Sequence, residues 1–412
     1  MRTAGAHSNG ARADHAAGGA AHRLRAETSD LLSTAGRWRI PELVLFSGLI
    51  FEGSMFGLPL PLNQLVMVAI ICLALTRRPQ VELGRLQLIV PLLVIGLFYV
   101  GVISIFADPT DFASDWKRRL IRLCLTATLV LVLSTGRIDL RSALSGFGLG
   151  MLFNAVAFHL GVAPDYYGGA LSGYFTDKNV AGLAYAVFGL LMLAALDRRW
   201  QRVVLLIVFA FLVWDTESRT ALSAFAAGAV WILIAPRLGV VGRWLMGLFI
   251  FFGVDLLAED FSQIGVFSDR EGSDLLRSRI DAASEIKVGD AGFFGSGLGE
   301  AYIVFNDDPG KVWYFHNSYW SALVEGGWPW LAVLMVITVI FALRPFTRDL
   351  DPQEIAIQAG AIALLICAWR LGEVFFTVQW AVVIGFAIFI HARRMQGGVD
   401  VVVMSPPRGA AR

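Results

Sequence analysis

The sequence predicts an all-α protein, a polytopic bundle of about 12 transmembrane helices with one long loop on its outer face. Three observations predict this fold. The 412-residue chain is 56% hydrophobic with a mean hydropathy of +0.64, outside the range of soluble globular domains. Long apolar runs fill residues 41 to 392, and a helix of about 20 apolar residues crosses a bilayer core. The ionisable residues of these runs gather on one side. Because burying a charge in lipid is costly, ionisable residues inside such runs indicate a functional site.

The apolar runs predict twelve helices. The first and the seventh are short enough to enter the membrane and return on the same side. None of the runs alternates polar and apolar residues as the strand of a membrane β-barrel does. The predicted helices are 41–57, 59–76, 86–107, 118–135, 142–162, 180–196, 202–217, 219–235, 240–258, 316–343, 355–371 and 374–392.

Arginine pairs between the runs predict how the chain is oriented. The loops that carry Arg77-Arg78, Arg198-Arg199 and Arg393-Arg394 fall on one side, and cytoplasmic loops are the ones enriched in Lys and Arg. The loops on the opposite side hold fewer cations and more aspartates, Asp108 and Asp177 among them. We therefore expect a multi-pass membrane protein with both termini in the cytoplasm.

The chain divides into one membrane domain and two polar tails. Residues 37–394 form the predicted membrane domain, and its longest polar segment, 259–315, faces outward in this topology. Residues 1–36 are rich in Ala, Gly, Arg and His without periodicity, which is typical of a disordered cytoplasmic tail. They show no signal-peptide pattern, so the first helix is expected to act as an uncleaved signal anchor. Residues 395–412 form a second, short cytoplasmic tail.

Composition argues against several classes of function. Cys72, Cys124 and Cys367 all lie inside apolar runs, so neither a disulfide framework nor a zinc site with the usual cysteine spacing is predicted. A net charge of +1 gives no reason to expect nucleic acid as a partner. The outer loop has no Asp-x-Asp pair and no array with metal-ligand spacing, so we expect no metal and no other cofactor.

The outer segment contains a predicted amphipathic helix and a glycine-rich turn. Within 273–287, Leu276 and Ile280 recur at helical spacing after Ser273, a suitable N-cap. Such a helix can lie on the membrane rim or cover a cavity. The string GFFGSGLG at 292–299 follows no predicted strand. We therefore interpret it as a tight turn that brings backbone close to another group, rather than as a nucleotide-binding loop.

His316 is the histidine that its surroundings single out. It lies in Phe315-His316-Asn317-Ser318, where the outer loop enters the tenth predicted helix. A neutral imidazole accepts a proton near pH 7, as a general base must. A histidine that caps the helix or joins an interfacial belt of aromatic side chains is an equally good interpretation. Asn317 and Ser318 are candidates for orienting the imidazole or an acceptor.

Five arginines are predicted at the outer face, where arginine is unexpected. The planar guanidinium group binds phosphate oxygens through two parallel hydrogen bonds and keeps its charge in a low dielectric. Arginines near helix ends usually extend to lipid headgroups. Several of them beside one histidine and an amphipathic helix nevertheless indicate the handling of a lipid-linked phosphate. The five are Arg118, Arg122, Arg219, Arg279 and Arg370.

Four short segments, in their order and spacing, resemble the O-antigen ligase and O-antigen polymerase superfamily of bacterial inner-membrane proteins. They are 173–179 (GYFTDKN), Glu217-Ser218-Arg219, Arg279 followed by the glycine-rich turn, and His316-Asn317 with nine residues before Gly327. The resemblance covers about residues 40 to 392. The fourth segment departs from the family pattern at its end, because Trp330 stands where Gly, Thr or Tyr is usual.

The resemblance implies a metal-independent, inverting glycosyltransferase of the bacterial inner (cytoplasmic) membrane, with its site facing the periplasm. The donor would be a glycan linked to a polyprenyl diphosphate such as undecaprenyl diphosphate. The acceptor would be lipid A core for a ligase, or a second lipid-linked glycan for a polymerase of O-antigen or exopolysaccharide, and a polysaccharide assembly complex is a possible partner. The spacing of the fourth segment slightly favours a ligase.

The resemblance also implies roles for individual residues. His316 would accept the proton of the attacking hydroxyl, although a carboxylate of the outer loop is an open alternative. Arg219 and Arg279 match motif positions of the family and would offset the charge of the departing diphosphate. Ser218 and Gly327 would support the site. The alternative loop carboxylates are Glu300, Asp307 and Asp308.

Two other classes of function remain open at this point. A secondary transporter of an anion or lipid-linked sugar would place charges near the membrane midplane on broken helices and would show an internal repeat. Glu52 and nearby prolines fit such a site, but the halves of the chain show no convincing repeat. A non-catalytic scaffold of an assembly complex would tolerate replacement of its arginines by lysine, whereas a bidentate phosphate site would not.

Overall fold

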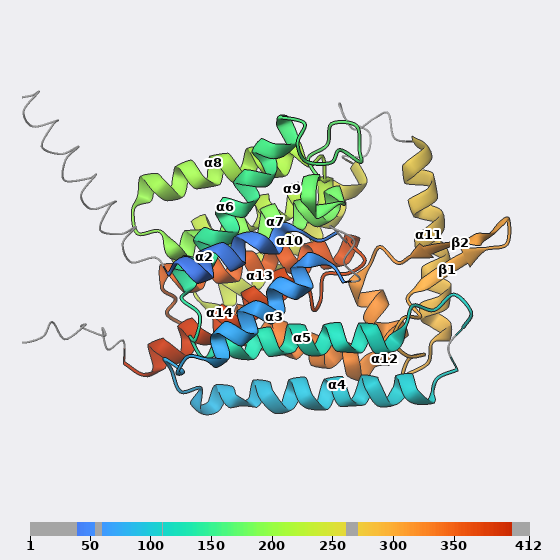
Figure 1. Ribbon diagram of the computed structural model, residues 1–412, viewed down its shortest axis with the longest axis horizontal. Coiled ribbons are helices and arrows are strands. Elements are labelled where there is room, and N and C mark those ends of the chain that lie inside the picture. The colour runs from blue at the N-terminus through green and yellow to red at the C-terminus, as the bar shows by residue number, and fades with distance from the viewer. Residues whose placement is uncertain (1–38, 54–59, 109, 261–270, 398–412) are drawn as a thin grey trace, which may run out of the picture.

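The computed structural model is mainly helical (Figure 1). It describes residues 39–53, 60–108, 110–260 and 271–397, so the predicted tail 1–36 and most of 395–412 lie outside the described residues. The helices of the predicted membrane domain are α2 (Ile40–Ser47), α3 (Leu62–Leu75), α4 (Ile89–Phe106), α5 (Trp116–Ser134), α6 (Leu140–His159), α7 (Lys178–Leu191), α8 (Arg199–Asp215), α9 (Arg219–Ile234), α10 (Val240–Asp260), α12 (Ser318–Met335), α13 (Pro352–Arg370) and α14 (Val378–Met395). Short 3-10 helices adjoin them at η1 (Gly48–Ile50), η2 (Gly84–Leu88), η3 (Gly173–Phe175), η4 (Met192–Ala195) and η5 (Ala235–Arg237), and α12 continues as a π-helix, η8 (Val336–Leu343).

Every predicted run contains one of these helices, but not all of them are long enough to span a membrane. Among the described residues, seven helices are long and apolar enough, and three apolar helices are shorter. α5 starts with four cationic residues in its first seven, and α8 has 17 residues. The helical membrane fold is therefore supported, while about 12 crossings remains a prediction. The seven are Gly84–Phe106, Leu140–His159, Lys178–Ala195, Arg219–Arg237, Ser318–Leu343, Pro352–Arg370 and Val378–Met395.

The first predicted helix, 41–57, is shorter in the structure. Its helical part ends at Ile50, and α3 starts only at Leu62, directly after Pro61. Proline has no backbone N–H to donate and fixes its own φ, so it favours the start of a helix over its interior. Glu52 consequently lies in the connection between η1 and α3 and not inside a helix.

Most helices of the predicted membrane domain lie roughly along the long axis of the molecule, whereas α11 runs across it (Figure 1). The described chain starts and ends at one end of the bundle, and α11 with the two strands lies at the other end. α13 is the central helix, since it packs against α7, α9 and α14. Trp380 of α14 and Tyr185 of α7 are among the largest fully buried side chains. This packing leaves the helix ends near α11 free to form a site.

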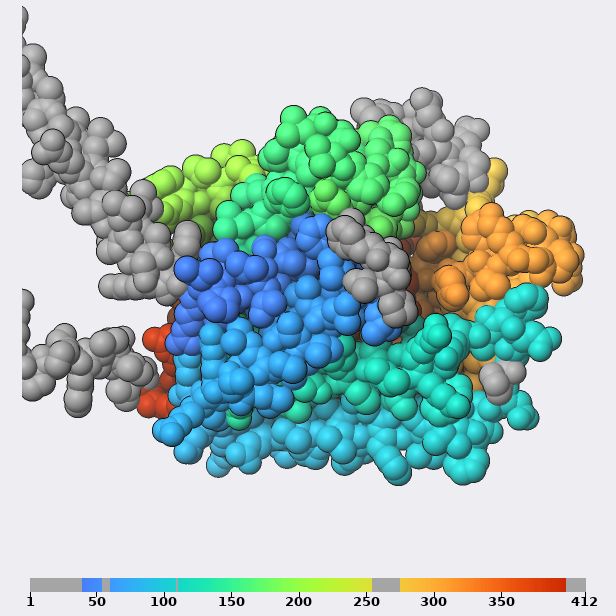
Figure 2. All heavy atoms as spheres, in the orientation of Figure 1, coloured from blue at the N-terminus to red at the C-terminus, as the bar shows by residue number. Residues whose placement is uncertain are grey.

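The outer segment folds into α11 (Glu271–Asp290) and an antiparallel hairpin of β1 (Tyr302–Phe305) and β2 (Asp308–Tyr314). The hairpin is an element that the sequence analysis missed. α11 starts before Ser273, so the prediction that this residue caps the helix is wrong. The predicted apolar face is confirmed, because Ile280 packs with the buried Ile303 and Phe315. Figure 2 shows the hairpin beside the connection between α4 and α5 at this end.

Candidate functional site

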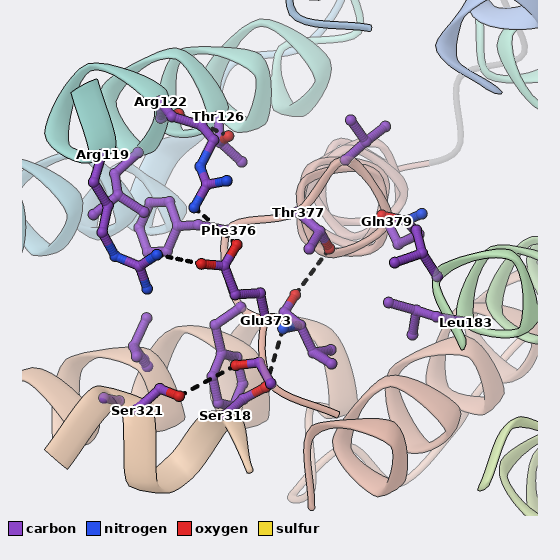
Figure 3. Close-up of a pocket in the computed structure, with 18 of the residues that line it drawn as sticks. Arg119, Arg122, Thr126, Leu183, Ser318, Ser321, Glu373, Phe376, Thr377 and Gln379 are labelled. Carbon is purple, nitrogen blue, oxygen red and sulfur yellow. Dashed lines mark hydrogen bonds and ion pairs between the residues drawn. The ribbon is translucent and has the colours of Figure 1, made fainter. Parts of the chain in front are cut away.

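A cavity of about 230 Å³ lies among the helix ends near α11. Its wall comes from the residues after η1, the first turns of α3 and α7, the first half of α5, most of the length of α12, the connection between α13 and α14, and the start of α14. Figure 3 shows part of this wall. Eight of its lining residues carry charged or amide side chains, and such groups among apolar helices are costly to bury and therefore indicate a functional site. They are Glu52, Asn63, Gln64, Arg119, Arg122, Glu325, Glu373 and Gln379.

The arginines in the first turns of α5 face either the cavity or solvent. The helix begins where the Asp115 side chain accepts hydrogen bonds from the amides of Lys117 and Arg118. Arg119 and Arg122, three residues apart, share one helix face and line the cavity. Arg118 instead has an 86% exposed side chain and lies 3.5 Å from Asp115. Of the predicted pair Arg118 and Arg122, the structure therefore places only the second in the cavity.

Two carboxylates, Glu325 and Glu373, hold these arginines in an ion-pair network. Figure 3 shows Glu373 between Arg119 and Arg122. Arg119 Nε lies 2.7 Å from Glu325 Oε1, and Arg119 Nη2 donates to Glu325 Oε2 at 2.9 Å. Arg119 also pairs with Glu373, and Arg122 Nη2 donates to Glu373 Oε2 at 2.8 Å. The Glu325 side chain is 4% exposed and that of Arg119 is 15% exposed. Each of these buried charges would be strongly destabilising without the opposite charge of its partner. Glu373 is 48% exposed and bridges the two guanidinium groups.

Glu373 carries a negative charge because of these arginines. The protein packed around this half-exposed carboxyl would by itself raise its pKa, but the charges and hydrogen bonds of Arg119 and Arg122 outweigh that effect and lower the pKa to about 2. Its backbone is held by α12. Ser318 Oγ donates to Leu371 O at 2.6 Å and accepts a hydrogen bond from the amide of Val374 at 3.0 Å. Ser318 therefore positions the carboxylate that faces the arginines.

Asn317 caps the N-terminal end of α12. Its side-chain oxygen accepts hydrogen bonds from the amides of Tyr319 and Trp320, so it is the N-cap of α12. This cap fixes where α12 starts, and it thereby places Ser318 and Glu325 on the cavity wall. The sequence analysis considered Asn317 for orienting an imidazole or an acceptor, and in the structure its side-chain oxygen caps α12.

Gly327 interrupts α12, and the glycine-rich turn 292–299 packs against this interruption. Gly327 has φ 66° and ψ −164°, and a Cβ atom there would lie 2.0 Å from Phe293 O. Gly299 N donates to Glu325 Oε1 at 3.0 Å, and two further amides of the turn donate to carbonyls of α12. The glycines thus bring backbone against backbone, as the turn interpretation predicts, and these amides are engaged by the protein itself.

His316 lies beside the cavity without lining it. Its Nδ1 is 3.8 Å from Asp281 Oδ1 on α11, and both side chains are about one-third exposed. That separation is longer than a hydrogen bond. Ser318, two residues further on, does line the cavity. His316 therefore occupies the junction between α11 and α12, next to the ion-pair network and outside it.

The other predicted arginines do not line this cavity. Arg279 donates to Asp307 at 2.6 Å and lies 3.9 Å over the ring of Phe305, on the side of α11 that faces the hairpin. Arg219 is the first residue of α9 and Arg370 the last of α13; both are partly buried and interact within the protein. Four of the five predicted arginines, Arg118 included, thus lie outside the cavity.

Ser218 precedes α9 at its N-cap position and does not line the cavity. Its hydroxyl lies 3.3 Å from Asn179 Oδ1 at the start of α7. Ala221 and Ser218 crowd Gly182, where an added Cβ would come within 2.9 Å of each. Ser218 therefore joins α7 to α9 rather than contributing to the ion-pair network.

The three loop carboxylates considered as bases are also outside the cavity. Glu300 is buried and accepts hydrogen bonds from the amide and hydroxyl of Thr110 at 2.9 and 3.0 Å. Lys287 Nζ lies 3.5 Å from it, and burial lowers the pKa of Lys287 while Glu300 opposes this shift. Asp307 pairs with Arg279, and Asp308 is exposed on the hairpin. Glu300 therefore ties α11 and β1 to the connection after α4.

No protein-family model and no curated protein matches this chain. The resemblance to the O-antigen ligases accordingly rests on four short segments. Among the described residues, no group of three or more His, Cys, Asp or Glu side chains could hold a metal ion.

Sequence reasoning missed most of the network. The sequence analysis names none of Arg119, Glu325 and Glu373 as a site residue. One available signal was a carboxylate in the short connection between two apolar runs. Its partners lie more than 45 positions away in the chain, at Arg119 and Glu325, and only folding reveals them.

Proposed function

We propose that this protein is a membrane glycosyltransferase that takes a glycan from a polyprenyl-diphosphate donor and passes it to an acceptor hydroxyl. The observation that carries the proposal is the pair Arg119 and Arg122, whose guanidinium groups meet in one cavity at an end of the helical bundle. Guanidinium groups in a site of low dielectric stabilise the charge that develops on a departing diphosphate. The resemblance described above names the same chemistry.

Glu373 defines the anion-binding position in this proposal. A carboxylate and a phosphate oxygen make the same charge-assisted hydrogen bonds to arginine. The Glu373 carboxylate bridges both guanidinium groups and is the more exposed of the two acidic partners. A diphosphate that reaches the cavity would take its place, while Arg119 stays attached to Glu325. The donor headgroup would then lie between α5 and the start of α12.

The test compares two arginines of one helix. Arg122→Gln is expected to weaken the binding of undecaprenyl diphosphate in nanodiscs about 10- to 100-fold, because one charge-assisted hydrogen bond contributes about 1.5–3 kcal/mol. Arg118→Gln, whose side chain faces solvent, is the matched control and should bind as the wild type does. Binding is measured by native mass spectrometry, with undecaprenol as the uncharged comparison. Equal loss in both variants, or none in either, would contradict the proposal.

A deletion strain tests whether the acceptor is lipid A core, as for a ligase, or a second lipid-linked glycan, as for a polymerase. In a deletion strain, long lipid-linked chains that accumulate without attachment indicate a ligase that uses lipid A core. A single repeat unit in place of long chains indicates a polymerase whose acceptor is a second lipid-linked glycan. An unchanged profile of surface polysaccharide would count against both.

A secondary transporter is the second candidate, and one observation favours it. α12 is broken at Gly327, two residues after Glu325 of the cavity wall, and broken helices beside charged residues form the substrate sites of many transporters. Flux of a lipid-linked sugar or an anion into proteoliposomes, driven by an ion gradient and independent of any acceptor, would favour this candidate. Transfer to an acceptor without such flux would exclude it.

A further inference from the structure

Glu52 faces the same cavity as the two arginines from a different element. It lies directly after η1, at residues 51–53, where several backbone hydrogen bonds fix the chain. Its amide donates to Tyr174 O at 3.2 Å, and the amide of Asn63 donates to Phe51 O at 2.9 Å. The sequence analysis noted Glu52 only as a charge that a transporter could use. Nothing in the proposed binding of the diphosphate uses its carboxyl group.

The surroundings of Glu52 favour a carboxyl group that takes up and releases a proton, whereas those of Glu373 favour a carboxylate that keeps its negative charge. Glu373 forms ion pairs with Arg119 and Arg122, whereas no ion pair to Glu52 is found among the described residues. The hydrogen-bond partner of Glu52 is the neutral Gln379 of α14. A carboxylate held between two arginines is a poor base, and one beside an amide keeps its basicity.

The charged groups around Glu52 come from three elements. Arg122 of α5 attracts its negative charge, while Glu373 and Asp177, the N-cap of α7, repel it. Burial has the largest effect, and the pKa of Glu52 rises to about 8 despite the hydrogen bond from Gln379. A general base works best when its pKa lies near the working pH, because it is then both available and strong enough to take a proton.

We propose that Glu52 is the catalytic base that accepts the proton of the acceptor hydroxyl, an inference that rests on the transferase function proposed above. The O–H bond of the acceptor breaks, and its proton passes to a carboxylate oxygen of Glu52. The hydroxyl oxygen forms the new bond to the anomeric carbon. The bond between that carbon and the diphosphate oxygen breaks, and its electron pair leaves with the diphosphate beside Arg119 and Arg122. Glu52 then releases the proton to solvent, and no oxidant or reductant takes part.

This assignment answers the question that the sequence left open about the base. His316 and the loop carboxylate Glu300 do not line the cavity. Glu300 is also committed to Thr110 and Lys287. Glu52 shares the cavity with the arginines that would hold the leaving group, so donor and acceptor can meet there without a rearrangement of α11.

The experiment uses the full-length protein in nanodiscs and the undecaprenyl-diphosphate-linked glycan extracted from a strain that lacks the gene. Glu52→Gln is expected to lower kcat by about 10²- to 10⁴-fold, the usual contribution of a general base, with donor binding unchanged. In the wild type, kcat should rise with pH through a limb near 8, and this limb should be absent from the residual activity of Glu52→Gln. Glu52→Asp should recover part of kcat, since it restores a carboxylate. Glu285→Gln, at an exposed position of α11, is the matched control.

Each outcome decides between the two proposals. Wild-type kcat and an unchanged pH limb in Glu52→Gln would overturn the role of Glu52 and leave the transferase function standing. If His316→Gln removes the pH limb while Glu52→Gln retains it, the role of Glu52 is likewise overturned and the transferase function still stands. Loss of donor binding in Glu52→Gln, with no change in the pH limb of its residual activity, would make Glu52 a binding residue and overturn its role as base. Absence of both donor binding and transfer in the wild type would overturn both proposals together.

Discussion

Replacing Arg119 with alanine tests the ion-pair network most directly. The substitution leaves Glu325, whose side chain is 4% exposed, with the amide of Gly299 as its remaining partner. Removing one partner of a buried ion pair costs about 3–5 kcal/mol, because the other charge stays buried without compensation. Glu373 loses less, since it keeps Arg122 and is half exposed. We expect Arg119→Ala to lower the free energy of unfolding by about 3–5 kcal/mol.

The assay is equilibrium unfolding in mixed micelles with increasing SDS, followed by circular dichroism. Arg118→Ala is the matched control, because its exposed side chain predicts a change below about 0.5 kcal/mol. The double variant Arg119→Ala/Glu325→Gln should be more stable than Arg119→Ala, since a neutral amide needs no counter-charge. The reasoning is refuted if Arg119→Ala loses less than about 1 kcal/mol, or if the double variant is no more stable than the single one.

Two further predictions concern the backbone and pH. Gly327→Ala should destabilise the protein by at least about 1–3 kcal/mol, because only glycine adopts this φ and ψ readily, and the added Cβ would also collide with Phe293 O. Gly310→Ala, with open space around its position, is the control for the same unfolding assay, and equal effects would contradict the role of Gly327. The lowered pKa of Glu373 means that its ion pairs stabilise the fold above its ordinary pKa of 4.5, and that this stabilisation is lost as pH falls from there towards 2. The difference in unfolding midpoint between the wild type and Glu373→Gln should therefore shrink across that window, and a difference that stays constant would show that the ion pairs do not cause it.

The positions of the helices could be predicted because each is coded locally. α12 starts two residues after the predicted start at 316, and α4 with its preceding 3-10 turn starts two residues before the predicted 86. Apolar runs of this length have few alternatives to helix in lipid, since every backbone polar group must find its partner within the run. The exception at 41–57 has a local cause as well, in Pro61 and the polar residues that follow Ile50.

The hairpin of the outer segment was missed although its sequence carries a signal. Asn306-Asp307 follows a run of β-branched and aromatic residues, 302–305, and Asn and Asp after such a run are typical of a turn between strands. Trp313 and Tyr314 are two of the aromatic side chains near His316 that one interpretation of the sequence places in an interfacial belt. They pair across the hairpin with Ile303 and Tyr302. A short hairpin depends on the surface it packs against, here α11, and that surface is not visible in the local pattern.

By itself, then, the sequence determined a helical membrane protein with an amphipathic outer helix, a glycine turn and an excess of arginine near one end. Only the tertiary structure decided which arginines act together. The rotation of α5 about its axis turns Arg119 and Arg122 towards Glu325 and Glu373 and leaves Arg118 in solvent. That rotation follows from packing against α3, α4 and α14, because a mostly apolar helix with cations on several faces has no local preference for one of them. Glu52 enters the same cavity for the same reason, since contacts between distant segments and not its neighbours in the chain place it there.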